Sequence, residues 1–435
     1  MTWQNWAGTA SADPVRRAWP RSTEEIANAI TAAAKDDLTA RALGSGHSFT
    51  PAAATSGVAL DLSGWAGVTG ADLDSGLITV RSGTTIRDLN AALDTLGLAM
   101  ANLGDIDAQT VSGAISTGTH GTGAGLGGIA TQVTGLELVL GDGSVVSCSA
   151  SERPDLFSAA RVSVGALGVL SSVTLQCVPA FTLAADERPM PVDEVLDQFD
   201  EFAAANDHFE FYWFPYGKNA LVKRNNKISR GNAPLSPAPM PKWRRFLEYE
   251  VMENAAFGAL CRTGRAMPAT IKPLNRFAAA TLSKRTYSAP SHEVFVTPRR
   301  VRFVESEYAV PRESLLDVLA ELRAGVTRLA HPVMFPVEVR VAAADDIWLS
   351  TAYGRDSAYV AIHQYVGLPY AEYFRLFESI ATSVGGRPHW GKMHTRDAAY
   401  LGQAYPRFAD FLRIRDETDP ERRFANPYLT QVFGD

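Results

Sequence analysis

The sequence predicts an α+β fold divided into two domains. Its 435 residues exceed the length that one hydrophobic core normally organises. Helical and strand patterns alternate up to about residue 180. Beyond that point, helical patterns combine with longer strands in which apolar and polar residues alternate. The second pattern is typical of helices packed on an antiparallel sheet.

Composition and charge favour a small-molecule partner. The chain is 46% hydrophobic and 20% charged, which is typical of a folded globular protein rather than a disordered or fibrous one. It carries 41 Lys or Arg against 47 Asp or Glu, a net charge of −6. No global positive field is therefore available to attract nucleic acid or anionic lipid. We expect no nucleic-acid partner and no membrane insertion.

Cysteine usage and the first residues bear on the compartment. Cys148, Cys177 and Cys261 form no C-x-x-C pair, so neither a zinc cluster nor a disulfide scaffold is predicted. The first residues show no basic segment followed by an apolar one, and no apolar stretch of about 18 residues occurs. We interpret the chain as a cytoplasmic protein.

The elements of the first 180 residues follow from local signals. Ser22 and Glu25 form a capping box, and apolar residues at helical spacing come next. Thr85 and Asp88 open a second helix, which Gly97 closes. The expected strands cover residues 38–43, 57–62, 77–80 and 169–175, with a hairpin over 135–147.

The elements of the second half are expected from periodicity alone. A helix over 192–205 precedes a strand over 208–214, and residues 225–243 have no periodic pattern and read as a long loop. The remaining expected elements are strands over 301–308, 333–341 and 358–365 and helices over 313–323 and 370–383.

A first glycine-rich segment, residues 41–49, is a candidate phosphate-binding turn. It follows a helix and a strand and lacks a third glycine, so it does not fit the nicotinamide dinucleotide fingerprint. Gly44 and Gly46 allow backbone N–H groups to converge on a diphosphate, and Ser45 and Ser48 add hydroxyl donors. The alternative is a plain Gly-Ser turn.

Two further glycine-rich segments follow. Residues 111–123 contain four glycines and five Ser or Thr, a composition that suits backbone lying against a planar, polar ligand. The alternative is a flexible surface loop. Gly165 and Gly168 bring backbone close either to a ligand or to a neighbouring element.

In their order and distances, the three segments resemble the FAD-binding domain of the vanillyl-alcohol oxidase flavoproteins, also called the p-cresol methylhydroxylase (PCMH) type. The resemblance implies an FAD cofactor. The cofactor-binding residues that it implies are Arg41, Gly44, Ser45, Gly46, His47, Ser48, Ser112, Gly113, Ser116, Thr117, Gly118, Thr119, His120, Gly121, Gly165, Gly168 and Val173.

The same resemblance implies a covalent flavin at His47. In this superfamily a histidine at that place is often bonded to the flavin 8α-methyl group. An imidazole with one free ring nitrogen is a nucleophile at neutral pH, and attachment makes the flavin a stronger oxidant. Without the resemblance, a lone His in a Gly-Ser turn is an ordinary solvated or hydrogen-bonding residue.

Two motifs of the second half carry charge. In the alternating stretch 335–341, Glu338 and Arg340 share one face of a strand. The plain alternative is a solvated ion pair on a sheet face. Residues 386–394 gather two His, an Arg, a Lys and a Trp around Gly391, which indicates a functional loop. The two His lie five residues apart without an acidic neighbour, so we expect no metal.

These motifs, together with residues 419–427, resemble the sugar-1,4-lactone (aldonolactone) oxidases and dehydrogenases that act on gulono-, galactono- and arabinono-lactones. The resemblance implies an FAD domain of residues 1–180 completed by 400–435, with a substrate (cap) domain over 181–399. The implied reaction moves a hydride from the lactone C2 to flavin, gives an ascorbate-type product, and passes electrons to O₂ or another acceptor. Alditol oxidases share much of the pattern and remain an alternative, as does a non-enzymatic flavin-storing or sugar-binding protein.

The resemblance also places the reacting groups. Arg340 and Lys392 are expected near the developing alkoxide or the reduced flavin, where positive charge helps most. Glu338 is expected to orient the polyol or Arg340, because a carboxylate beside Arg should have a low pKa and accept protons poorly. His389 is the other candidate base.

Oxygen reactivity is expected to depend on residues 112–114. If Gly113 faces the path to the flavin, its missing side chain leaves the path open, and hydrogen peroxide is the expected product. If Ala114 faces the path, a dehydrogenase that uses a dye or cytochrome is expected. We favour the first arrangement slightly, which makes the protein an oxidase.

Overall fold

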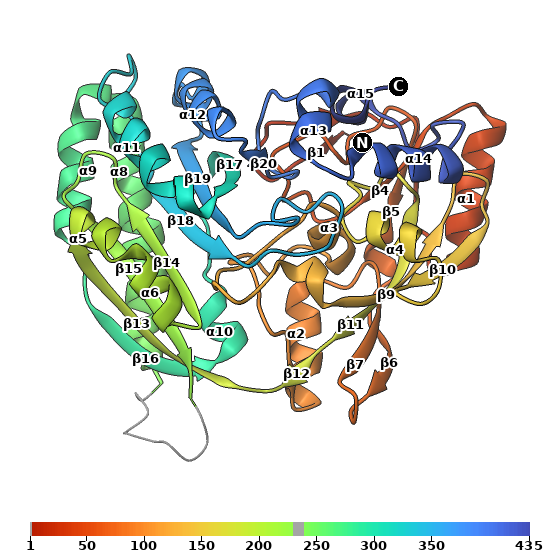
Figure 1. The fold of residues 1–435 in the computed structure, drawn as a ribbon, viewed down its shortest axis with the longest axis horizontal. Helices are drawn as coiled ribbons and strands as arrows, with labels where there is room; N and C mark the ends of the chain where they lie inside the picture. The colour runs from red at the N-terminus through yellow and green to blue at the C-terminus, as the bar shows by residue number, and fades with distance from the viewer. Residues whose placement is uncertain (1, 229–238) are drawn as a thin grey trace.

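The structure, a computed structural model, describes residues 2–228 and 239–435. In this part of the chain the strands form five sheets, of which the largest has eight strands. Figure 1 shows that sheet and its helices on one side of the molecule, with the smaller sheets and both chain ends on the other.

Two sheets near the N-terminus share one helix. Strands β3 (Arg16–Ala18), β5 (Val58–Asp61) and β4 (Ala40–Leu43) pair in parallel. An antiparallel sheet has the order β10 (Val145–Ser149), β9 (Val133–Val139), β11 (Val169–Gln176), β7 (Leu77–Arg81) and β6 (Val68–Asp72). Helix α1 (Thr23–Lys35) contacts both sheets and buries Ile26 and Ile30 between them.

Helices from both ends of the chain pack in one core. The N-terminal helices are α2 (Ile86–Thr95), α3 (Val111–Ser116) and α4 (Pro154–Ala160). The C-terminal helices are α13 (Ala398–Ala404), α14 (Phe408–Thr418) and α15 (Pro427–Phe433). Their apolar side chains belong to the same cluster, which also contains Trp390. The last 40 or so residues therefore fold onto the N-terminal half, as Figure 1 shows.

Two short antiparallel pairs complete this side of the molecule. Strand β1 (Trp3–Gln4) pairs with β2 (Ser11–Ala12), and β8 (Leu98–Ala99) pairs with β12 (Val178–Pro179). No helix among the described residues is long and apolar enough to span a membrane.

The eight-stranded sheet is antiparallel throughout. Its order is β16 (Arg285–Pro290), β13 (Thr182–Pro191), β15 (Asn219–Lys227), β14 (His208–Trp213), β18 (Val337–Ala342), β19 (Ser357–Tyr365), β17 (Phe303–Pro311) and β20 (Arg387–Pro388). Helices α11 (Leu315–Val326) and α12 (Ala371–Ser383) cover one face, where Val337, Val339 and Val341 of β18 are buried. The residues that alternate with these valines point to the opposite face.

Most predicted elements are confirmed, including the caps of α1 and α2. The Ser22 side chain accepts a hydrogen bond from the Glu25 N–H, and the Thr85 side chain accepts one from the Asp88 N–H. The helix predicted over 192–205 divides at Gln198 into α5 (Val192–Asp197) and α6 (Phe199–Ala205).

The loop predicted over 225–243 is wrong at both ends. Residues 225–227 belong to β15, and helix α7 (Lys242–Arg245) begins before the loop was expected to finish. Residues 229–238 lie outside the described part of the chain. Strand β13 was not predicted because its centre is charged: Asp186 pairs with Arg224 at 2.6 Å, and Glu187 pairs with Arg285.

Candidate active site

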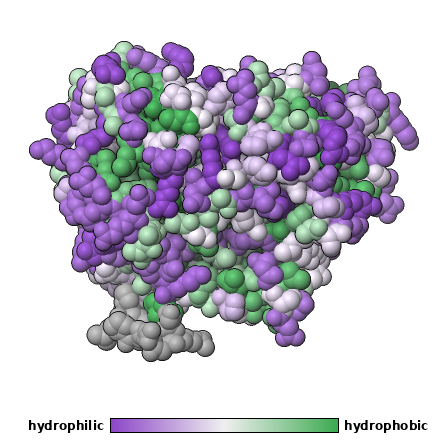
Figure 2. All heavy atoms as spheres, viewed as in Figure 1, coloured by the Kyte–Doolittle hydropathy of each residue, from purple (hydrophilic) through white to green (hydrophobic). Residues whose placement is uncertain are grey.

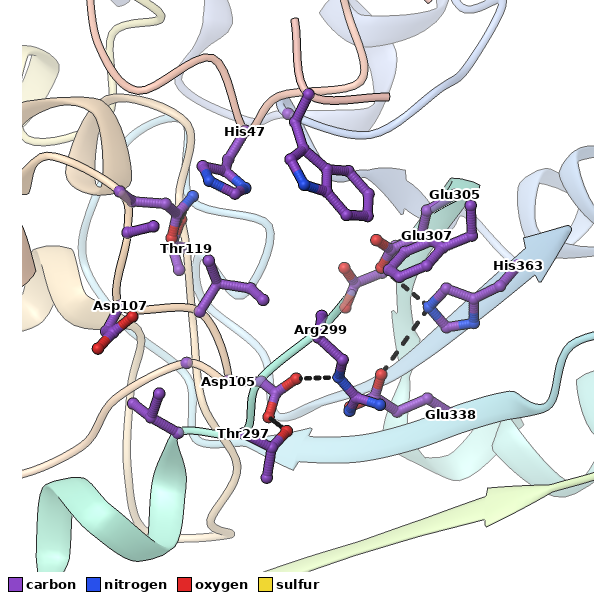
Figure 3. A pocket seen from close by; sticks show the side chains of 18 of the residues that line it. His47, Asp105, Asp107, Thr119, Thr297, Arg299, Glu305, Glu307, Glu338 and His363 are labelled. Atoms are coloured by element: carbon purple, nitrogen blue, oxygen red, sulfur yellow. Dashed lines mark hydrogen bonds and ion pairs between the residues drawn. The ribbon is translucent and has the colours of Figure 1, made fainter. Parts of the chain in front are cut away.

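Two adjoining cavities lie between the N-terminal half and the large sheet. The first has a volume of about 460 Å³ and is lined by residues of both (Figure 3). The second, of about 110 Å³, is lined mainly by the glycine-rich segments. His47, Ser48, Gln109 and Thr117 line both cavities, so the two cavities share a wall at these residues.

The structure brings most of the expected cofactor-binding residues to these cavities. Those that line the second cavity are Arg41, Gly44, Ser45, Gly46, His47, Ser48, Ser112, Gly113, Ser116, Thr117, Gly165 and Gly168. Thr119 and His120 line the first cavity. Gly118, Gly121 and Val173 are among the lining residues of neither cavity, and Val173 is fully buried in the core.

The second cavity has the form of a cradle for phosphate groups. A Cβ added to Gly44 would lie 3.0 Å from Thr110 Oγ1. Gly46 and Gly165 have φ values of +71° and +67°, and Gly168 has +156°. Such backbone is strained for other residues, and the absence of side chains lets N–H groups approach a ligand closely. The residues present therefore fit the diphosphate part of FAD.

Arg41 holds this cradle together. Its guanidinium donates hydrogen bonds to the backbone carbonyls of Val164 and Gly165 at 2.8 Å and of Phe424 at 2.9 Å, and also to Ala52. Burial lowers the pKa of Arg41 to about 10, which leaves it charged at neutral pH. Arg41 thus connects three distant segments around the cavity through its own donors.

His47 lies at the junction of the two cavities. Its ring stacks on Trp6 with centroids 5.9 Å apart, and Figure 3 shows it pointing into the first cavity. Burial and, secondly, Lys392 lower the pKa of His47, so the ring is neutral at neutral pH. A neutral imidazole has one nitrogen lone pair free for nucleophilic attack.

Glu338 and Arg340 share one face of β18, as predicted, and both line the first cavity. They form an ion pair with each other, and Arg340 Nε lies 3.0 Å from Glu210 Oε2 on the neighbouring strand β14. The Tyr212 hydroxyl donates a hydrogen bond of 2.8 Å to Glu338. Because Glu338 is only 6% exposed, the solvated-pair alternative is wrong.

The low pKa expected for Glu338 is also wrong. Burial raises the pKa of this carboxyl group, and the neighbouring Arg340 only partly opposes the effect. The expectation failed because it counted the nearby charge but not the loss of water around the carboxylate.

Lys392 is held against β17 by charge and by backbone bonds. Its Nζ lies 2.5 Å from Glu305 Oε2 and 3.9 Å from Glu307 Oε2. The N–H groups of His389 and Met393 donate to the carbonyls of Glu307 and Glu305, which fixes the loop on the strand. Burial alone would raise the pKa of Glu305, but Lys392 and His363 together outweigh burial and hold it at about 2.

His389 is a poor candidate for the base. Burial lowers its pKa to about 3, and its Nδ1 accepts a hydrogen bond of 3.0 Å from the Gly391 N–H.

Among the described residues, the side chains of His389, His120 and Glu307 form one group that could bind a metal ion, with ligand atoms within 4.8 Å of one another. His120 already uses both nitrogens, at 2.8 Å from Gly121 O and 2.9 Å from Glu307 Oε1.

Several cavity residues were not predicted from the sequence. These are Asp105, Tyr212, Arg299, Glu305, Glu307 and His363, all in the lining of the first cavity. His363 donates from Nδ1 to the Pro336 carbonyl at 3.0 Å, and its Nε2 lies 3.4 Å from Glu305. The sequence could have indicated Glu305 and Glu307. Two acidic residues two positions apart in an otherwise apolar strand point to the same side of the sheet, which predicts a charged cavity there.

Asp105 and Arg299 close the first cavity from opposite halves of the molecule. Asp105 Oδ2 lies 2.6 Å from Arg299 Nε, and the Thr297 N–H donates to the Asp105 carbonyl. Burial would raise the pKa of Asp105, but Arg299 and other cations hold it below its usual value. Figure 3 shows this pair beside Glu338.

Comparison with known proteins agrees with this geometry. The family model "D-arabinono-1,4-lactone oxidase" matches residues 173–432, and an FAD-binding domain model matches residues 14–149. An L-gulono-1,4-lactone dehydrogenase of Mycobacterium tuberculosis is 42% identical over 432 residues, which cover 99% of each chain. The chain belongs to the D-arabinono-1,4-lactone oxidase family.

Other members and neighbours of the D-arabinono-1,4-lactone oxidase family are similar over nearly the whole chain. An L-gulonolactone oxidase of Mus musculus is 36% identical over 442 residues and covers 100% of this chain and 98% of its own. A solvent-stable cholesterol oxidase of solved structure covers 100% of this chain and 97% of its own, with a TM-score of 0.85 and 20% identity. The predicted family, fold class and FAD-dependent oxidation of CH–OH groups are confirmed.

The Lys392–Glu305 pair predicts a pH-dependent loss of stability in Glu305→Gln. At neutral pH the variant should be less stable by about 3 kcal/mol, because Lys392 loses its carboxylate partner in a partly buried place. The native pKa of Glu305 is depressed, so its contribution is present above its unfolded pKa and is lost as pH falls toward about 2. Urea unfolding of variant and parent should therefore show a difference that shrinks with acidification.

Glu201→Gln, at an exposed position, is the control and should change little. A stability difference between Glu305→Gln and parent that is absent at neutral pH would contradict the ion pair.

Proposed function

We propose that this protein oxidises a sugar-1,4-lactone, such as L-gulono-, L-galactono- or D-arabinono-1,4-lactone, at the C2 hydroxyl to give an ascorbate-type product. The observation that carries the proposal is the placement of Arg340 and Lys392 on one cavity wall, next to the glycine-lined cradle. The names of the mycobacterial and mouse relatives support this substrate class.

The site residues have different roles in the proposed reaction. When bound, FAD supplies the acceptor for the hydride of the C–H bond. Arg340 and Lys392 stabilise negative charge on the substrate oxygen, and their buried partners keep them in place before substrate arrives. Glu338 is a better proton acceptor than His389, because burial raises the pKa of Glu338 whereas that of His389 falls to about 3.

We assign the FAD-binding domain to residues 1–180 together with 400–435, and the substrate domain to 181–399. The shared core of the N-terminal and C-terminal helices supports the first assignment. The separate core under the large sheet supports the second. The first cavity, lined from both sides, is then the place where the lactone meets the flavin.

One relative favours a second substrate class. An alditol oxidase of a Streptomyces species is 32% identical over 454 residues, covering 99% of this chain and 98% of its own. Anaerobic mixing of the FAD-loaded protein with L-gulono-1,4-lactone, D-arabinono-1,4-lactone or xylitol, each in a separate experiment, distinguishes lactone oxidation from alditol oxidation. A lactone should bleach the flavin absorbance. Bleaching by xylitol alone would establish an alditol oxidase, and bleaching by no compound would revive the non-enzymatic alternative.

Removing either cation should slow flavin reduction strongly. Lys392→Ala and Arg340→Ala should each reduce the anaerobic rate by roughly 10²-fold or more, because each removes charge stabilisation of the transition state. Stopped-flow absorbance measures the rate, with the exposed Lys35→Ala as control. Unchanged rates in folded, flavin-loaded variants would remove both residues from the chemistry.

We assign His47 as the covalent attachment point of the flavin. Its neutral ring at the junction of the two cavities supports this assignment. Acid-precipitated parent protein should therefore stay yellow, whereas His47→Ala should release its FAD into the supernatant or be isolated without it. A parent whose flavin washes out freely would refute covalent attachment.

Oxygen reactivity should depend on Gly113. This residue lines the second cavity, Ala114 is fully buried, and neither is among the lining residues of the first. The reduced parent should reoxidise rapidly in air, and Gly113→Ala should be slower by about tenfold if the added Cβ narrows the oxygen path. Gly125→Ala is the control, because its Cβ would meet open space. Equal reoxidation of parent and Gly113→Ala would exclude this gate.

A further inference from the structure

A row of polar side chains extends along the first cavity away from Lys392. The row begins with the ion pair of Lys392 and Glu305. His363 Nε2 lies 3.4 Å from Glu305 Oε1 and 4.0 Å from Glu338 Oε2. On its other side, Glu338 accepts the hydrogen bond of 2.8 Å from the Tyr212 hydroxyl group. All of these residues line the cavity, so a ligand that lies there meets them in sequence.

Arg299 is the last cation of this row. Its Nη2 lies 3.5 Å from the Tyr212 hydroxyl group, which therefore stands alone between Arg299 and Glu338. On the far side, Arg299 Nε lies 2.6 Å from Asp105 Oδ2. Figure 3 shows His363, Glu338, Arg299 and Asp105 one after another in this order. The row thus carries positive charge at both of its ends.

The guanidinium group of Arg299 retains a donor that no protein group uses. Nε donates to Asp105, whereas Nη1 has no hydrogen-bond partner in residues 2–228 and 239–435. Burial alone would lower the pKa of Arg299, but Asp105 and Tyr212 raise it, so the group is charged at neutral pH. The oxygens of Asp105 are occupied by Arg299 and by the Thr297 hydroxyl group. Asp105 therefore positions Arg299 and leaves the binding of a ligand to it.

The two other unassigned arginines of the cavity lining are less suited to bind a ligand. The side chain of Arg87 is 67% exposed and contacts Asp107 through both Nε and Nη2. The side chain of Arg245 is 48% exposed and is paired with Glu293. Arg299 is 31% exposed and lies deeper in the cavity wall, where hydrogen bonds compete less with water.

We infer that Arg299 binds the side-chain hydroxyl groups of the lactone and so selects lactones with a longer side chain. The inference rests on the proposed function, which places the C2 oxygen at Arg340 and Lys392. The side chain is attached at C4, two ring atoms from C2, and the hydroxyl groups that it carries are a short distance from the reacting carbon. Arg299 lies at such a distance from Glu338. A planar guanidinium group can donate to two neighbouring hydroxyl oxygens at once.

Two lactones that differ only in the side chain test the inference. L-Gulono-1,4-lactone carries hydroxyl groups on C5 and C6, whereas D-lyxono-1,4-lactone has the same ring and ends at C5. The measurement is the second-order rate constant of anaerobic flavin reduction by each lactone, from stopped-flow absorbance. The parent should prefer L-gulono-1,4-lactone by about tenfold or more, because hydrogen bonds to a charged donor favour it. Arg299→Gln should lose most of this preference.

Two further variants separate binding from folding. Arg300→Gln changes the adjacent arginine, which is 64% exposed, bonds to Glu250 and is not in the cavity lining, so it should keep the preference of the parent. Arg299→Lys keeps a positive charge beside Asp105 if Arg299→Gln does not fold. Its preference should also fall, because one ammonium group lacks the planar pair of donors.

The ratio of the two rate constants decides the inference. A ratio in folded, flavin-loaded Arg299→Gln or Arg299→Lys equal to that of the parent would overturn it, even if both rates fell, because a purely structural contact affects the two lactones alike. A parent without any preference for L-gulono-1,4-lactone would overturn it as well. A parent flavin that neither lactone bleaches would refute the proposed function and this inference together.

Discussion

The candidate site depends on keeping two partly buried cations paired with buried carboxylates. Removing an ammonium or guanidinium group from water costs several kcal/mol unless an opposite charge and hydrogen bonds replace the water. Lys392 meets Glu305, and Arg340 meets Glu338 and Glu210. The register of the sheet supplies these partners, since Arg340 lies directly opposite Glu210 across β18 and β14. The charges are thus in position before any substrate arrives, which is the condition for electrostatic catalysis.

The second requirement is a backbone-lined cradle next to these charges. Arg41 connects the loop after β4, the segment at Gly165 and the C-terminal segment at Phe424 through its guanidinium. Asp105 and Arg299 join the two halves of the molecule across the first cavity. Both sets of interactions use buried charge to fix the relative position of segments that are far apart in the sequence. Together they hold the glycine-lined cradle beside the side of the first cavity that carries Arg340 and Lys392.

Local signals predicted much of the fold and part of the site. The caps at Ser22 and Thr85, the glycine-rich segments and the shared face of Glu338 and Arg340 are all properties of short stretches of sequence. Glu210, which lies 130 residues from Arg340, was missed because the pairing of distant strands is not visible in a local pattern. The direction of the Glu338 pKa shift was missed for a related reason, because burial depends on the complete tertiary structure.

The central claim is that Arg340 and Lys392 face the C2 oxygen of the lactone, which loses its proton when the hydride leaves the C2 carbon. A crystal structure of the FAD-loaded protein with a bound L-gulono-1,4-lactone, obtained without turnover, tests it most directly. The account predicts the lactone in the first cavity, with its C2 oxygen within hydrogen-bond distance of Lys392 Nζ or the Arg340 guanidinium. A lactone bound in that cavity with its C2 oxygen turned away from both cations, or bound elsewhere, would contradict it.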